Sequence, residues 1–305
     1  HKGLEAMFTM MNEARLGVGV QSIAISEIAY QNSVIYAKER IQGKSFSNQG
    51  KLSADSKTII NHPDVRRNLL DQKSFIEGGR ALSIWVASLL DKSNYLLDDR
   101  AYGLASLLTP IVKGYLSDIG FEMTVVSQQI FGGHGYIEEW GMSQFVRDSR
   151  IAMIYEGTNG VQAIDLVFRK VLNNKVLLNF TSIIKEEIKM NNEAKELKRF
   201  SKILGDNLKL LEDFSNLLEK MNKTNKDDVS AACNDFLKVL GYISLAFSWF
   251  KISKISFKKL NDNKSFYEEK INTANFFYDK ILPRAEMHYN TAKSGSDNIM
   301  NAKFN

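Results

Sequence analysis

Apolar side chains recur every three or four residues over several long stretches of the chain, which is the spacing of one helical face. The first stretch begins at Ala6, and its apolar positions include Met10, Leu16 and Ile23, with Gly43 expected to end the helix. Four later stretches in the first half repeat this spacing. They predict helices over residues 65–90, 101–129, 143–150 and 160–172.

The second half keeps the helical spacing but changes in composition. From Asn173 onward the chain is rich in Lys, Asn, Glu and Leu, and a polar break is expected over residues 221–228. Helices are predicted to follow over 229–258 and 265–294. Prolines occur only at positions 63, 110 and 283, which favours long helices. The predicted fold is all-α, with a four-helix bundle over 1–172 and a second helical bundle or extension over 173–305.

Composition and charge exclude several classes of protein. The net charge of +5 comes from 40 basic and 35 acidic residues that are interspersed, without the arginine-rich aromatic face of a nucleic-acid groove. No run approaches the roughly 20 apolar residues of a membrane span, which predicts a soluble chain. The single cysteine, Cys233, excludes an internal disulfide and fits a reducing, cytoplasmic compartment. Four histidines without a carboxylate pair at ligand spacing argue against a metal site.

Two glycine-rich loops lie close together between residues 127 and 162. Gly132, Gly133 and Gly135 follow an apolar run, where glycine ends a helix and lets the backbone approach a ligand. Glu156 lies in the second loop, directly after the apolar residues 151–154. A partly desolvated carboxylate at such a turn is a stronger base, which is suited to abstracting a proton. The alternative is a plain helix–helix connection that carries a solvated glutamate.

The residues of these loops resemble a known family. The segment 129–136 (QIFGGHGY), then Arg147-Asp148, and then residues 154–158 (IYEGT) are similar to the C-terminal signature of the flavin-dependent acyl-CoA dehydrogenases. The resemblance is specific from Gly3 to about Lys170 and looser beyond. It implies a C-terminal helical domain that is preceded, in the family, by a helical and a β-domain. Because the sequence starts at His1 without a leader, these domains are expected to be missing from it, and the fragment alone is expected to be inactive.

The family's chemistry is carried over through matching residues. The resemblance implies that Glu156 is the catalytic base, which removes the α-proton of an acyl-CoA while FAD accepts the β-hydrogen as a hydride. The backbone N–H of Glu156 and a ribityl hydroxyl of FAD would hold the thioester carbonyl, as an oxyanion hole does. The substrate-binding residues implied are Asn12, Arg15, Tyr155 and Gly157. Without the resemblance, Arg15 would equally be a surface arginine of an early helical turn.

The resemblance also implies an FAD site that is shared between subunits. Arg40 and the glycine loop would contact the cofactor of a neighbouring subunit, which predicts a homodimer or homotetramer. Alternatively, Arg40 is a cation near a helix C-terminus, and His62 has only a structural role. The sequence departs from the family at Phe46, a weak substitute for an aromatic contact to adenine, and at Gly160, where relatives often have glutamine. The cofactor-binding residues implied are Arg40, Gln42, His62, Gln129, Gly132, Gly133 and Thr158, with His134 lining the same loop.

The long C-terminal segment resembles an extended subgroup of the family. That subgroup includes 3-methylmercaptopropionyl-CoA dehydrogenase together with medium- and long-chain enzymes. The resemblance implies an electron-transfer flavoprotein as the electron acceptor. Two alternatives remain open: a flavin acyl-CoA oxidase, which passes electrons to oxygen, and a non-catalytic helical interaction module. In the segment itself, His288 and Cys233 are isolated and indicate no chemistry.

Overall fold

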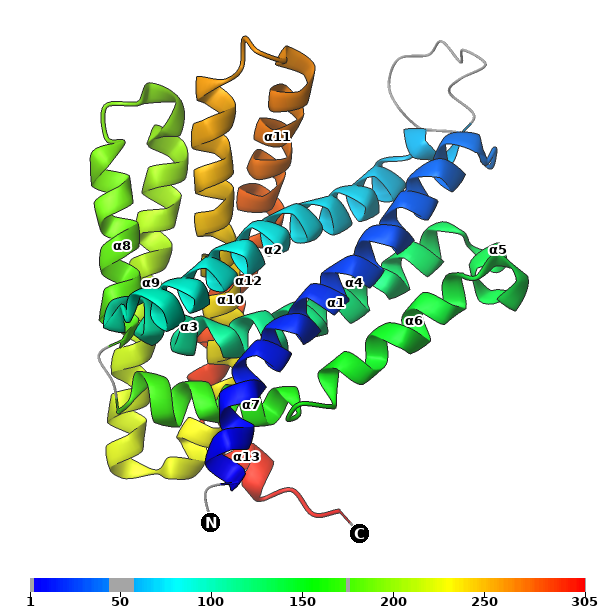
Figure 1. The fold of residues 1–305 in the computed structure, drawn as a ribbon. Coiled ribbons are helices and arrows are strands. Elements are labelled where there is room, and N and C mark those ends of the chain that lie inside the picture. The colour runs from blue at the N-terminus through cyan, green and yellow to red at the C-terminus, as the bar shows by residue number, and fades with distance from the viewer. Residues whose placement is uncertain (1–2, 44–57, 174–175, 305) are drawn as a thin grey trace.

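The first half of the chain folds into long helices that cross the molecule obliquely. The computed structural model describes residues 3–43, 58–173 and 176–304, and these residues form helices and connecting turns without a named strand. Helices α1, α2 and α4 lie side by side, with α6 alongside them (Figure 1). The bounds of the longer elements are α1 (Gly3–Glu39), α2 (Pro63–Leu96), α3 (Asp99–Pro110), η3 (Ile111–Tyr115), α4 (Leu116–Ile130), α6 (Met142–Arg150), α7 (Asn159–Asp165) and η6 (Leu166–Val171).

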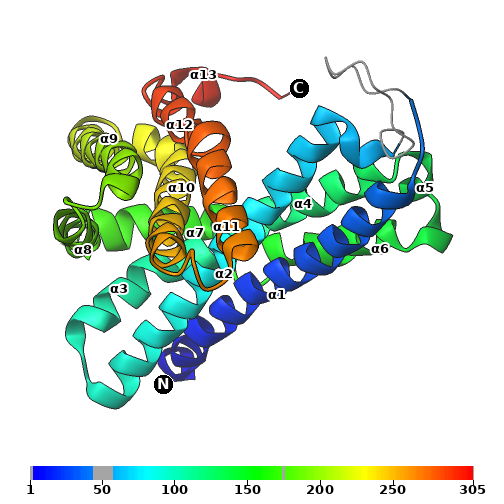
Figure 2. The same ribbon diagram turned by 90° about the horizontal axis from the view of Figure 1, so that it is seen from above.

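The second half forms a group of helices that stand nearly upright beside the first (Figure 1). Viewed from above, α10 lies at the centre of this group, between α9 and α11 (Figure 2). Short helical turns complete the chain in both halves: η2 (Ile59–Asn61), α5 (Gly133–Tyr136), η4 (Glu138–Trp140), η5 (Ile151–Met153), η7 (Lys195–Leu197) and α13 (Asp297–Met300). The longer elements of this half are α8 (Val176–Met190), α9 (Lys198–Thr224), α10 (Lys226–Lys258), α11 (Lys264–Phe276), η8 (Phe277–Ile281) and α12 (Arg284–Ala292).

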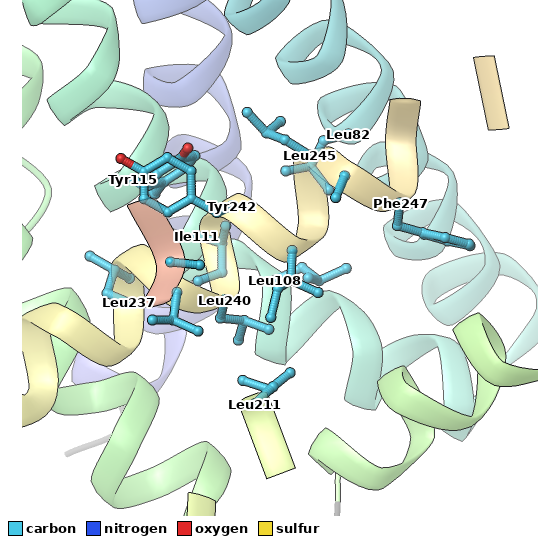
Figure 3. Packing of buried hydrophobic residues seen from close by; sticks show 14 of the residues in the cluster. Leu82, Leu108, Ile111, Tyr115, Leu211, Leu237, Leu240, Tyr242, Leu245 and Phe247 are labelled. Atoms are coloured by element: carbon cyan, nitrogen blue, oxygen red, sulfur yellow. The ribbon is translucent and has the colours of Figure 1, made fainter. Parts of the chain in front are cut away.

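One hydrophobic core joins the two halves. Helix α10 packs against α2, α7, α9, α11 and α12. Its Tyr242 meets Tyr115 of η3 edge to face, with ring centroids 5.3 Å apart, and Leu237 and Leu240 lie beside Ile111 (Figure 3). The indole of Trp249 is fully buried and donates a hydrogen bond to the carbonyl of Ser74, at 2.9 Å. The C-terminal segment is therefore packed into the same core as the first half.

The predicted all-α fold is confirmed, but several predicted boundaries are wrong. Helix α1 ends at Glu39 rather than at Gly43, and α2 continues to Leu96. The polar break over 221–228 is reduced to Asn225, whose side chain caps α10 by accepting a hydrogen bond from the Asp227 N–H at 3.0 Å. The last helix is interrupted before Arg284, since Pro283 has no N–H to continue it.

The helix predicted over 101–129 contains a π-helical turn. Pro110 lies inside the helical run, where its missing N–H and its ring disturb the regular hydrogen bonds. The next turn, η3, widens so that the Leu116 N–H bonds to the carbonyl of Ile111, five residues back. Such π-turns are often found at functional sites. Here the turn faces the second glycine-rich loop through Lys113.

Helix α10 is long and apolar enough to cross a membrane. However, 83% of its most apolar stretch is buried inside the protein. Burial against other helices is what a core helix of a soluble protein requires, whereas a span would present its apolar surface to lipid. The burial of α10 therefore favours a core helix.

Candidate functional site

The second glycine-rich loop is a sharp turn between η5 and α7. Glu156 has a φ of +58° and Gly157 a φ of +85°, so two successive residues adopt the left-handed conformation. For a residue with a side chain this conformation costs on the order of 1–2 kcal/mol. Such strain persists only where the surroundings fix it, and it is found preferentially at functional sites.

Side chains from three helices hold the backbone of this turn. The carbonyl of Glu156 accepts hydrogen bonds from Arg15 Nε at 3.4 Å and from Gln162 Nε2 at 3.3 Å. The carbonyl of Gly157 accepts one from Lys113 Nζ at 2.7 Å. Glycine is favoured at 157, since its φ of +85° strains a residue with a side chain and a Cβ there would also lie 2.9 Å from Gln162 Nε2. The carbonyls of Glu156 and Gly157 therefore point toward side chains of the protein.

The reactive groups of Glu156 remain available. Its side chain is half-buried, and within residues 3–43, 58–173 and 176–304 neither its carboxylate nor its backbone N–H has a hydrogen-bond or ion-pair partner. A carboxylate and an N–H of one residue can therefore both meet a ligand at this turn. The left-handed backbone fixes the direction of the N–H and of the Cα–Cβ bond from which the carboxylate extends.

The remaining residues predicted to bind the substrate lie around this turn. The Tyr155 hydroxyl donates a hydrogen bond to Gln21 Oε1 on α1, which attaches the turn to that helix. Asn12 is half-buried on α1, three residues before Arg15. Thr158, predicted to contact the cofactor, caps α7 by accepting a hydrogen bond from the Val161 N–H at 3.4 Å. The structure thus groups Tyr155 and Thr158 with Glu156 and places Asn12 one helical turn from Arg15, while their roles toward a ligand stay predictions.

A second group of predicted residues lies at the other end of α1. The His62 ring donates from Nε2 to the carbonyl of Gln42 at 2.8 Å, and the Ile59 N–H bonds to the carbonyl of Arg40 at 2.8 Å. The Arg40 side chain is exposed, and within the described part of the chain its guanidinium has no carboxylate partner. An exposed guanidinium of this kind can bind a phosphate in bidentate fashion. Phe46 lies outside the described residues.

The first glycine-rich loop lies beside this second group. Gly132 has a φ of +58°, and its N–H bonds to the carbonyl of Gln129 at 3.0 Å. A Cβ at Gly132 or Gly133 would meet only open space, so this face of the loop is accessible. At Gly135, by contrast, a Cβ would lie 2.2 Å from the carbonyl of Gln128. The loop is therefore packed tightly on one side and open on the other.

His134 fastens the glycine loop to α1. Its Nδ1 is 2.9 Å from the Tyr36 hydroxyl, and its ring stacks on Trp140 with centroids 4.5 Å apart. Tyr36 in turn stacks on Phe131, at 4.1 Å. These contacts give His134 a structural role at the loop. No group of three His, Cys, Asp or Glu side chains that could hold a metal occurs in the parts of the chain described.

The structure thus divides the predicted site residues into two groups. Arg15 contacts the Glu156 turn and Tyr36 contacts the glycine loop, and the two residues lie 21 positions apart on one continuous helix. At 1.5 Å per residue they are separated by about 32 Å. The turn before α7 and the loop at α5 accordingly lie at opposite ends of α6 in Figure 1.

A buried polar network behind the turn was not predicted from the sequence. Lys113 is fully buried, and besides Gly157 its ammonium donates to Asn159 Oδ1 at 2.8 Å. Asn159 Nδ2 donates to Asp118 Oδ1 at 2.6 Å, and Lys238 of α10 lies 3.7 Å from Asp118 Oδ2. The only signal in the sequence was a single lysine inside an apolar helical run.

An apolar groove lies elsewhere on the described part of the chain. It has a volume of about 530 Å³ and lies between α1 and α2. Its lining includes Leu16, Val20, Ile28 and Ile84, and none of the predicted site residues. The geometry of the Glu156 turn, rather than this groove, therefore identifies the candidate site.

The chain is an all-α protein with a left-handed turn at Glu156 and an open glycine loop. Both halves of its sequence match models of known families. Residues 1–171 match the family model described as "Acyl-CoA dehydrogenase, C-terminal domain". Residues 180–303 match the model "Acetyl-CoA dehydrogenase C-terminal like". The chain belongs to the acyl-CoA dehydrogenase family.

Two curated relatives are similar over different shares of the chain. The 3-methylmercaptopropionyl-CoA dehydrogenase of Ruegeria pomeroyi is 45% identical over 177 residues, which are 57% of this chain and 30% of that protein. The broad-specificity linear acyl-CoA dehydrogenase FadE5 of Mycobacterium tuberculosis is 30% identical over 301 residues, which are 93% of this chain and 49% of that protein. The chain thus spans about half, or less, of the length of these relatives.

Solved structures share the fold. An acyl-CoA dehydrogenase from Bacillus anthracis, solved in complex with FAD, superposes with a TM-score of 0.76 at 18% identity, over 95% of this chain and 50% of that one. ACDH-11 of Caenorhabditis elegans, solved in complex with C11-CoA, superposes with a TM-score of 0.74 at 19% identity, over 99% and 49%. At these identities the likeness establishes the arrangement of helices in both halves.

Proposed function

We propose that this chain supplies the catalytic base and part of the cofactor site of an FAD-dependent acyl-CoA dehydrogenase. The observation that carries the proposal is the turn at Glu156, where a strained backbone leaves a carboxylate and an N–H without partners among the described residues. Proton abstraction next to a thioester carbonyl needs these two groups: a base for the α-proton and a donor for the charge that develops on oxygen.

The proposed reaction converts an acyl-CoA into a trans-2-enoyl-CoA. The Glu156 carboxylate removes the α-proton, and the Glu156 N–H donates a hydrogen bond to the thioester carbonyl as negative charge grows there. Tyr155 and Gly157 border the thioester. When bound, FAD accepts the β-hydrogen together with its electron pair, and we propose that an electron-transfer flavoprotein then receives the electrons. Since Arg15 and Gln162 hold the Glu156 carbonyl, the base and the donor keep their alignment.

The second group of residues fits the outer part of the cofactor. Arg40 offers an exposed, unpaired guanidinium within the described chain, and Gly132 and Gly133 offer an open backbone surface. Gln42, Gln129 and His62 lie beside them, with the His62 ring fixed by the Gln42 carbonyl. These residues suit a pyrophosphate and its neighbouring groups.

The separation of the two groups leads to a prediction about assembly. Because about 32 Å separates them along α1, we expect the two groups to contact different FAD molecules, with Arg40 and the glycine loop at the flavin of a second copy. The flavin-loaded protein should therefore be a homodimer or homotetramer by multi-angle light scattering. Arg40→Ala should lower its flavin occupancy, whereas Arg169→Ala, a surface change on η6, should not. A monomer with full flavin occupancy would refute the shared site.

The substrate class is tested with a panel of acyl-CoA thioesters. The holoenzyme, carrying the helical and β-domains expected before this segment, should reduce an artificial electron acceptor in the presence of medium- or long-chain acyl-CoA or 3-methylmercaptopropionyl-CoA. We expect little hydrogen peroxide, because a dehydrogenase does not pass its electrons to oxygen. Peroxide formed in step with the enoyl-CoA product would indicate an acyl-CoA oxidase instead. If no thioester in the panel is oxidised, the proposed activity is wrong.

We propose that the enzyme is located in the cytoplasm.

A further inference from the structure

We propose that Lys113 is a positioning residue for the catalytic turn, because it holds the Gly157 carbonyl and thereby the left-handed backbone that aims Glu156. This inference rests on the proposed role of Glu156. Lys113 does not contact the carboxylate, so it acts through the backbone. It belongs to the π-turn η3, more than 40 positions before the residues it holds.

The contacts of Lys113 are specific rather than incidental. Its side chain is 0% exposed, and its ammonium lies 2.7 Å from the Gly157 carbonyl oxygen and 2.8 Å from Asn159 Oδ1. Asn159 is the first residue of α7, directly after the turn. The Lys113 ammonium therefore binds the turn on both sides of Thr158. Charge-assisted hydrogen bonds of this kind are about twice as strong as neutral ones.

A fully buried ammonium is costly unless it is compensated, which argues for a function. The charged groups that face Lys113 come from three elements: Asp118 of α4, Arg15 of α1, and Glu156 itself. Burial is the main effect and lowers the pKa of Lys113 to about 8, although Asp118 acts in the opposite direction. Lys238 of α10 lies on the far side of Asp118, so the C-terminal segment closes the network.

The lowered pKa predicts opposite effects on the turn and on the whole fold. In the folded chain Lys113 loses its proton near pH 8, but in the unfolded chain only near 10.5. The contribution of Lys113 to the free energy of unfolding should therefore increase with pH between these values, because at this residue the unfolded chain binds more protons there. The hydrogen bond from Lys113 to the Gly157 carbonyl should weaken over the same range, because the neutral amine no longer provides a charge-assisted bond.

The test replaces Lys113 by an apolar residue of similar length. In Lys113→Met, hydrogen–deuterium exchange of the peptide over 154–162 should accelerate about tenfold or more, while the urea midpoint changes little. In the holoenzyme, kcat should fall about 10- to 100-fold with a much smaller change in KM. The matched control is Lys170→Met, since Lys170 lies in another π-turn and bonds to Ser106 at 2.7 Å, away from the turn. The control should leave both readouts unchanged.

A further measurement keeps the proposal falsifiable. If Lys113→Met does not fold, exchange of the same peptide in the unaltered chain, corrected for intrinsic rates, should quicken as pH rises through about 8. Unchanged exchange in the folded variant, or in the pH series where the variant does not fold, would overturn the role of Lys113. Exchange is measured without substrate, so a holoenzyme that oxidises no acyl-CoA would refute the proposed function and leave this test intact.

Discussion

Glu156→Gln in the holoenzyme should remove nearly all acyl-CoA dehydrogenation while flavin content and folding stay the same. The amide has almost the same shape as the carboxylate but cannot accept the α-proton at neutral pH. General bases contribute about 10²- to 10⁴-fold to rate, and we expect kcat to fall by at least that factor. The backbone N–H of residue 156 is retained, so KM should change much less. Stopped-flow flavin bleaching with saturating acyl-CoA measures the chemical step directly.

The control for this prediction is a second glutamate at the surface. Glu139→Gln, in the exposed turn η4, removes the same charge without touching the Glu156 turn and should leave turnover unchanged. Flavin absorbance and the circular dichroism of both variants should match those of the unaltered protein. If Glu156→Gln bleached the flavin at an ordinary rate, another group would have to be the base.

Trp249→Ala should be the most destabilising single change in the C-terminal segment. The indole is fully buried, bonds to the Ser74 carbonyl at 2.9 Å, and lies so near α2 that a Cβ at Gly78 would be 2.7 Å from its Nε1. Truncating a buried tryptophan costs about 3–5 kcal/mol in the free energy of unfolding. Urea denaturation at 25 °C, followed by circular dichroism, measures this loss.

The same experiment asks whether the two halves unfold together. Since one core contains residues of both halves, Trp249→Ala should shift a single cooperative transition to lower urea. Tyr95→Ala is a matched control, because that aromatic side chain is 83% exposed and its loss should change the midpoint little. Two separate transitions, with only one of them displaced, would instead indicate that residues 1–172 and 173–305 are independent domains.

The all-α fold and the identity of the central glutamate could be predicted from the sequence because both are local properties. Apolar spacing reports which face of a helix is buried, and it located α1, α2 and α10 within a few residues. It failed over 221–228, where polar residues suggested a loop, because polar side chains on the exposed face of α9 do not stop a helix. In the same way, the spacing of residues 129–136 and 154–158 was sufficient to suggest the family.

What only the tertiary structure decided is which residues meet. Lys113 looked like an isolated cation in an apolar helix, and only the packing of η3 against the turn before α7 places its ammonium on the Gly157 carbonyl. Likewise, only the packing of α5 against α1 places His134 of the glycine loop on Tyr36, about 32 Å along the helix from Arg15, which holds the Glu156 turn. Helical spacing carries information over a few residues, whereas these contacts depend on how distant helices pack. The sequence by itself therefore determined the helices and indicated Glu156 as the proposed base, and tertiary packing determined what holds the backbone of its turn in place.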